Sequence, residues 1–131
     1  MKITNGFTLI EIMIAVVIVG ILASIAYPSY TQFVAKGARA DGVAGLMSAA
    51  NRQEQYYLDN KKYTDDMSKL GLGADPWIVD NKFYSIDAVV VNNTNFTLTA
   101  TALGTQATRD SACASITLNS TGNKLPKECW K

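Results

Sequence analysis

The 131-residue chain contains no histidine, the residue that most often serves as a general base or binds a metal ion. Nucleophilic catalysis needs a positioned base, and no phosphate-binding glycine-rich loop precedes a predicted helix. The sequence therefore predicts a protein that is not an enzyme and holds neither a cofactor nor a metal ion.

Charge and cysteine are also scarce. The 12 Lys and Arg residues nearly balance the 11 Asp and Glu residues, which excludes a strongly basic or strongly acidic protein. Cysteine occurs only at Cys113 and Cys129. In an exported chain an isolated pair indicates one disulfide, which for a loop of roughly 15 residues is worth about 3 kcal/mol by chain entropy. Two free thiols are the alternative.

A long apolar segment runs from Phe7 to Ala26 and contains a single charged residue, Glu11. At about 1.5 Å per residue, a helix over this segment is roughly 30 Å long, enough to cross a bilayer. A carboxylate within such a span costs at least about 2.5–3.5 kcal/mol on insertion scales. The segment offers no Lys or Arg to neutralise it. A chain cut just before Phe7 would supply the missing cation as a new α-amino group.

The residues before Phe7 favour such a cut, because they are polar and carry one cation, Lys2, with Gly6 at the junction. A secretory signal also begins with a charged stretch, but its cleavage site follows the apolar core. The segment Ser24–Ala26 could serve as that site, and a plain membrane anchor is a second alternative. Glu11 argues against both, since each needs an uninterrupted apolar region.

This N-terminal region resembles the cleavage motif of type IV prepilins, in the residues Gly6-Phe7-Thr8-Leu9-Ile10-Glu11. The resemblance continues through Gly20–Ala23 and Ala26–Tyr30. It implies that a prepilin peptidase cuts between Gly6 and Phe7 on the cytoplasmic side, and that the new Phe7 amine is N-methylated. It also implies that Glu11 pairs with the Phe7 amine of a neighbouring subunit.

The resemblance further implies where the chain resides and what it meets. Residues 7–30 would anchor it in the bacterial inner membrane as a single pass with the head in the periplasm, and later form the core of an extracellular pilus. The implied partners are other pilin subunits, the prepilin peptidase and N-methyltransferase, and the inner-membrane assembly platform. Gly20 and Pro28 weaken or kink a helix, and for the isolated subunit they predict a modest bend. The resemblance implies an alternative for the filament, in which similar pilins can lose helix between these two positions.

Beyond Tyr30, apolar residues recur at helical spacing and predict that the helix continues to about Leu58. The expected apolar stripe consists of Val43, Leu46, Met47, Ala50 and Tyr57. The expected solvent-facing positions are Lys36, Arg39, Asp41, Arg52 and Gln53. Three glycines, Gly37, Gly42 and Gly45, each lower helix propensity by up to about 1 kcal/mol.

Alternating apolar residues then predict strands over Phe83–Val91, Phe96–Ala102 and Cys113–Leu118, separated by Asn-rich turns. The polar stretch 59–82 should connect helix and sheet, with a short helical turn near Asp65–Leu70 and with Trp77 and Ile78 as anchors. The sequence therefore predicts an α+β fold in which a long N-terminal helix packs on an antiparallel sheet of three or four strands. The expected divisions are a leader at 1–6, a transmembrane assembly helix at 7–30 and a head at 31–131.

Three lysines, Lys124, Lys127 and Lys131, lie near the end that the cysteines would close. The first interpretation is a solvated rim. The alternative is contact with DNA or another anionic surface, because some type IV pili take up DNA.

Within the family, the cysteine pair, the Ala26–Tyr30 segment and the Cys129-Trp130 ending resemble the PilE type, a minor pilin in several bacteria and the major subunit in others. The predicted function is a structural subunit of a type IV pilus that supports pilus biogenesis, twitching motility, adhesion or DNA uptake. The alternatives are a pseudopilin of type II secretion and a membrane-anchored periplasmic binding module that never polymerises. Glu11 argues against the last, because a monomer gains nothing from that charge.

We predict that the chain is processed between Gly6 and Phe7. Replacing Gly6 with a bulky residue should leave an uncut precursor, because the junction requires a small side chain. Mass spectrometry of the N-terminus in isolated filaments checks this, and retention of Met1 would refute it.

Overall fold

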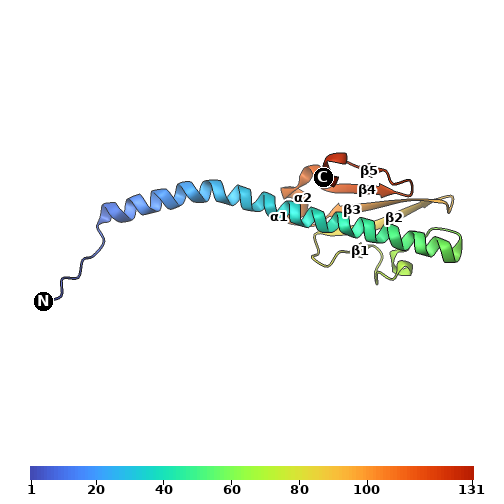
Figure 1. Ribbon diagram of the computed structural model, residues 1–131, viewed down its shortest axis with the longest axis horizontal. Helices are drawn as coiled ribbons and strands as arrows, with labels where there is room; N and C mark the ends of the chain where they lie inside the picture. The colour runs from blue at the N-terminus through green and yellow to red at the C-terminus, as the bar shows by residue number, and fades with distance from the viewer. The chain divides into compact units, whose positions relative to one another are not determined.

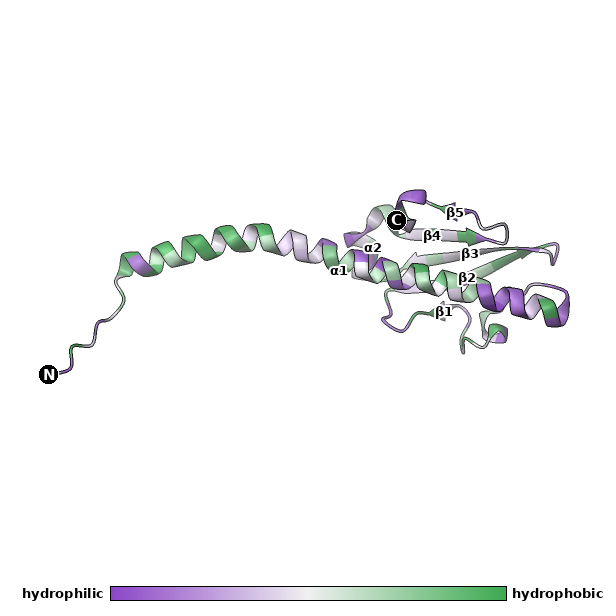
Figure 2. Cartoon of the chain, viewed as in Figure 1, coloured by the Kyte–Doolittle hydropathy of each residue, from purple (hydrophilic) through white to green (hydrophobic).

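The computed structural model describes all residues from 1 to 131 and divides into two compact units, Met1–Phe33 and Val34–Lys131. Helix α1, Leu9–Asn60, contributes residues to both units. It ends close to the predicted Leu58, and it remains helical at Gly20 and Pro28. Figure 2 shows apolar colouring over most of its N-terminal half and polar colouring at its C-terminal end.

The second unit contains a five-stranded antiparallel sheet with the strand order β1-β2-β3-β4-β5. The C-terminal half of α1 runs across one face of this sheet (Figure 1). The strands are β1 Trp77–Ile78, β2 Tyr84–Val91, β3 Asn95–Ala102, β4 Ser115–Asn119 and β5 Lys124–Leu125. The shorter helical elements are η1 Met67–Leu70, α2 Thr105–Arg109, η2 Ser111–Cys113 and η3 Lys127–Trp130. The predicted α+β class is confirmed.

The sheet has five strands where three or four were expected, and the two that were not located from the sequence are β1 and β5. Strands β1 and β5 are each two residues long, too short to show the alternation that identifies a strand. Helix α2, of five residues, was not predicted for the same reason. The helical turn expected near residues 65–70 is present as η1, which the side chain of Asp66 caps by accepting a hydrogen bond from the Ser68 N–H.

The alternation of the central strands predicted the inner face of the sheet correctly. Strand β2 buries Tyr84, Ile86 and Ala88, and its pairing with β3 places Ile86 opposite Ala100 and Ala88 opposite Leu98. The remaining inward residues are Phe96 and Ala102 on β3 and Ile116 and Leu118 on β4.

The face of α1 that packs on the sheet differs from the predicted stripe. Met47 is 50% exposed, whereas Gln53, expected in solvent, is fully buried. The buried positions of α1 are mostly small: Ala35, Ala38, Gly42, Gly45, Leu46, Ala49 and Gln53. The helix therefore approaches the sheet through small residues, and the large side chains that fill the space come from the strands.

Gly42 and Gly45 show how close this approach is. A Cβ added at Gly42 would lie 2.9 Å from two ring carbons of Tyr84, and one added at Gly45 would lie 2.7 Å from Cδ1 of Ile86. Both distances are shorter than carbon atoms tolerate, so a larger residue at either position forces a neighbouring side chain to shift. The two glycines weaken the helix but permit the packing of the core.

Gln53 tolerates burial because both ends of its amide form hydrogen bonds with the loop that follows α1. Its Oε1 accepts a hydrogen bond from the Thr64 N–H at 3.1 Å, and its Nε2 donates to the Thr64 carbonyl. Further along this loop, Trp77 packs against the core as expected, but Ile78 is 49% exposed and Val79 is buried in its place.

The predicted disulfide between Cys113 and Cys129 is present, and both cysteines are buried. Arg39, expected in solvent, is instead partly buried in a bidentate ion pair with Asp110, whose carboxylate raises the pKa of the guanidinium through these hydrogen bonds. Gln106 of α2 donates from Nε2 to the Ala35 carbonyl at 2.9 Å and to the Tyr84 hydroxyl at 3.2 Å. These contacts attach α2 to α1 and β2.

We predict that Gly42→Ala lowers the melting temperature of the intact chain in detergent micelles, because the added methyl group overpacks the Tyr84 ring at a cost of about 1–3 kcal/mol. Gly37→Ala is the matched control: it lies on the same helix, and nothing lies within 4 Å of the added Cβ. The control should stabilise the chain by up to about 1 kcal/mol, the gain in helix propensity. An equal response of the two variants would contradict the close-packing account.

Candidate functional site: the apolar helix and its carboxylate

The N-terminal half of α1 exposes an unbroken apolar surface. Every large apolar side chain from Phe7 to Ile25 is at least 52% exposed. A helix of this length and composition can cross a membrane. Water-soluble proteins rarely leave so large an apolar patch uncovered, so this surface requires lipid or other apolar helices as its surroundings.

Glu11 lies at the start of this helix and takes part in its N-terminal cap. The Thr8 hydroxyl accepts a hydrogen bond from the Glu11 N–H at 3.3 Å, and the Glu11 carboxylate accepts one from the Thr8 N–H at 3.4 Å. This reciprocal pair is a capping box, with Thr8 at the N-cap and Glu11 three residues later. The Thr-x-x-Glu pattern at residues 8–11 is the sequence signal from which this cap could have been predicted.

The capping box compensates only part of the cost of the carboxylate. Helix N-termini attract negative charge, typically by 0.3–1 kcal/mol. That is less than the roughly 2.5–3.5 kcal/mol that a carboxylate costs at the centre of a membrane helix. Glu11 makes no ion pair within the chain, since the only ion pairs are Arg39–Asp110 and Lys69–Asp66. The chain itself therefore supplies no cation for this carboxylate.

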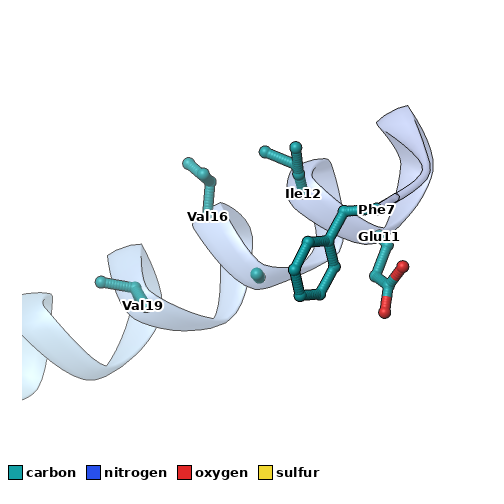
Figure 3. A pocket seen from close by; sticks show the side chains of 6 residues that line it. Phe7, Glu11, Ile12, Val16 and Val19 are labelled. Atoms are coloured by element: carbon teal, nitrogen blue, oxygen red, sulfur yellow. The ribbon is translucent and has the colours of Figure 1, made fainter. Parts of the chain in front are cut away.

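Phe7 lies beside this carboxylate. Figure 3 shows the ring of Phe7 and the carboxylate of Glu11 on the same side of the ribbon. Both line a shallow apolar groove together with Ile12, Ala15, Val16 and Val19. Residues 1–7 have neither helix nor strand and are exposed, and nothing lies within 4 Å of a Cβ added at Gly6. The bond between Gly6 and Phe7 is thus open to solvent.

Hydroxyl groups bind backbone carbonyls on both sides of Pro28, which itself cannot donate a backbone hydrogen bond. Ser24 donates to the Ile21 carbonyl at 2.7 Å, and Ser29 donates to the Ile25 carbonyl at 3.1 Å. Thr31 donates to the carbonyls of Tyr27 and Pro28 at 3.3 and 2.9 Å. Such side-chain bonds compete with the backbone bonds of a helix, but the stretch remains helical throughout.

The three C-terminal lysines have different surroundings in the fold. Lys124 places its ammonium 5.1 Å from the centre of the Trp130 ring, in a cation–π contact. Lys131 and Trp130 line a groove between α1 and η3, together with Lys36 and Glu128. Lys127 is exposed on η3 and does not line this groove.

Comparison with known proteins gives two family matches. Residues 28–117 match the family described as "Type IV minor pilin ComP, DNA uptake sequence receptor", and residues 1–27 match the prokaryotic N-terminal methylation motif.

Individual relatives agree with these matches. Fimbrial protein EcpC of Eikenella corrodens is 33% identical over 124 residues, which cover 93% of this chain and 78% of the relative. Type IV major pilin protein PilE1 of Neisseria gonorrhoeae is 31% identical over 100 residues, covering 76% of this chain but only 54% of PilE1. Type II secretion system core protein G of Dickeya chrysanthemi is 36% identical over 70 residues, covering 53% of this chain and 44% of the relative.

Proposed function

The chain belongs to the type IV pilin family, and on this premise we propose that it is a pilus subunit that polymerises through its apolar helix. We place the leader at 1–6, the membrane and assembly helix at 7–30, and the head at 31–131. Before assembly the helix crosses the inner membrane once with the head in the periplasm. A prepilin peptidase removes the leader and N-methylates Phe7, and the assembly platform transfers the subunit into the filament.

The observation that carries this proposal is the carboxylate of Glu11 on an exposed apolar helix that contains no cation. Lipid and a bundle of apolar helices are similar environments, so hydrophobicity alone gives little drive for the transfer. A charge pair between Glu11 and the Phe7 amine of a neighbour supplies a specific gain. A subunit in the wrong register would leave a buried charge unpaired, at a cost of about 3–5 kcal/mol.

The pilus is favoured over type II secretion by the extent of the matches. The pilin family match spans 28–117 and so includes the sheet through most of β4, whereas the secretion relative covers 53% of the chain. In a non-polymerising anchor, the carboxylate of Glu11 would serve only to cap the helix, and uncharged residues can do this as well. Pro28, which cannot donate a backbone hydrogen bond, and the hydroxyl groups that bind nearby carbonyls fit a helix that loses its regular bonding between Gly20 and Pro28 on assembly.

We predict that Glu11→Gln and Glu11→Leu both reach the membrane at least as well as the wild type, because the costly charge is gone. Both should enter sheared filaments at least about tenfold less often, in line with the cost of an unpaired buried charge. Glu11→Gln is the decisive variant, because glutamine also completes a capping box but carries no charge. The measurement is the subunit count in filaments at equal membrane levels.

The two variants separate the two roles of Glu11. Loss of incorporation in both assigns assembly to the charge. Wild-type incorporation of Glu11→Gln with loss in Glu11→Leu would assign it to the cap. Equal incorporation of all three forms would refute the charge pair and revive the non-polymerising anchor.

We also propose DNA binding by the head as a second function. Two observations support it. The matched family is described as a DNA uptake sequence receptor, and Lys124 contacts the Trp130 ring while Lys131 lines a groove with Trp130. Cations beside an aromatic ring suit a nucleic acid, because they bind phosphates while the ring stacks on bases. Glu128 in the same groove opposes this attraction, which points to modest affinity.

We predict that Lys124→Ala/Lys131→Ala weakens binding of duplex DNA and lowers the salt dependence of the binding constant by about one unit of slope per lysine. Fluorescence anisotropy at several salt concentrations measures both quantities. Lys62→Ala/Lys69→Ala is the matched control, because it removes the same charge from a different surface of the head. Equal loss in both double variants would mean that net charge, and not this groove, governs DNA binding.

A further inference from the structure

The head carries a second groove, which is separate from the groove lined by Trp130 and Lys131. It has a volume of about 420 Å³ and is lined almost entirely by polar side chains. Three separate segments form it: the end of α1, the loop after α1 and the hairpin between β2 and β3. The residues that give it its chemistry are Tyr56, Lys62, Asp65, Lys69, Asn92 and Asn93.

The floor of this groove is held rigidly. The buried Gln53 bonds both backbone groups of Thr64 and so fixes the middle of the loop. The Tyr63 N–H donates to the Asn93 carbonyl at 3.0 Å, which ties the loop to the hairpin. The Tyr63 ring stands edge-on to the buried Phe96, with ring centroids 4.7 Å apart. The groove is therefore formed before any ligand binds.

The rim of the groove differs from the floor in that four of its polar side chains are unpaired. The side chains of Lys62, Asp65, Asn92 and Asn93 form no hydrogen bond or ion pair within the chain, and all four are exposed. Asn92 and Asn93 adopt left-handed conformations with φ of 55° and 60°, which presents two adjacent amides at the turn. Each amide can both donate and accept hydrogen bonds.

We propose that this groove binds a neutral saccharide. A sugar offers many hydroxyl groups that donate and accept, which matches paired amides with one carboxylate and two ammonium groups beside them. Tyr56 adds a half-buried aromatic side chain that combines an apolar face with a polar tip. Asp65 disfavours a polyanion, Lys62 and Lys69 disfavour a polycation, and the polar lining disfavours an apolar ligand.

The test uses the intact, unprocessed chain in a zwitterionic detergent that contains no sugar. The probe is an array of immobilised neutral oligosaccharides that end in mannose, glucose, galactose or N-acetylglucosamine, with sialylated and sulfated oligosaccharides alongside. The wild type should bind at least one neutral class. Asn92→Gly/Asn93→Gly should weaken that binding at least about tenfold, because both amides are lost while glycine still accepts the left-handed turn.

Asn123→Gly is the matched control, since it removes one exposed amide from the β4–β5 turn. It should bind within about twofold of the wild type, and melting temperatures should show that all variants are folded. Binding to no neutral oligosaccharide, binding only to acidic ones, or unchanged binding by Asn92→Gly/Asn93→Gly would each overturn the proposal. The result does not depend on cleavage or polymerisation, so it stands or falls separately from the proposed pilus function.

Discussion

The proposed function depends on the Glu11 carboxylate, which lies in an apolar segment, residues 7–30, that contains no Lys or Arg. The chain leaves a large apolar surface uncovered and places one charge near its start. The capping box with Thr8 gives this charge a defined position but no counter-charge. We propose that lipid first, and neighbouring subunits afterwards, cover the apolar surface. In this proposal one ion pair, between the Glu11 carboxylate and the amine of a neighbour, sets the register of assembly.

The head is built by a different rule. Its half of α1 contributes small residues, and the sheet contributes the bulk, so that Tyr84 and Ile86 lie directly against Gly42 and Gly45. The disulfide between Cys113 and Cys129 and the contacts of α2 with α1 secure the C-terminal part. Both proposed ligand sites lie on this unit.

The sequence predicted what periodicity and unusual chemistry reveal. Glu11 stood out because a lone charge in an apolar run is costly, and the central strands stood out because Tyr84, Ile86 and Ala88 alternate with polar residues. The misses have physical causes. Strands of two residues are too short to show a period. A helix face made of glycine and alanine carries little hydrophobic signal, so the apolar pattern predicts Met47 in the core and Gln53 in solvent, the reverse of the structure. Gln53 is buried only because Thr64, distant in sequence, satisfies its amide. The groove formed by Tyr56, Lys62 and Asn92 could not be predicted from the sequence, because it exists only where the folded loop meets α1 and the β2–β3 turn.

A density map of the assembled filament is the most direct test of the proposed contact between the Phe7 amine of one subunit and the Glu11 carboxylate of the next. The map should resolve the processed N-terminus and the Glu11 side chain. The account predicts that the Phe7 nitrogen of one subunit lies within about 4 Å of a Glu11 carboxylate oxygen of the next, the separation of an ion pair. A filament in which the Glu11 carboxylate contacts only its own Thr8, with the neighbour's amine elsewhere, would contradict it.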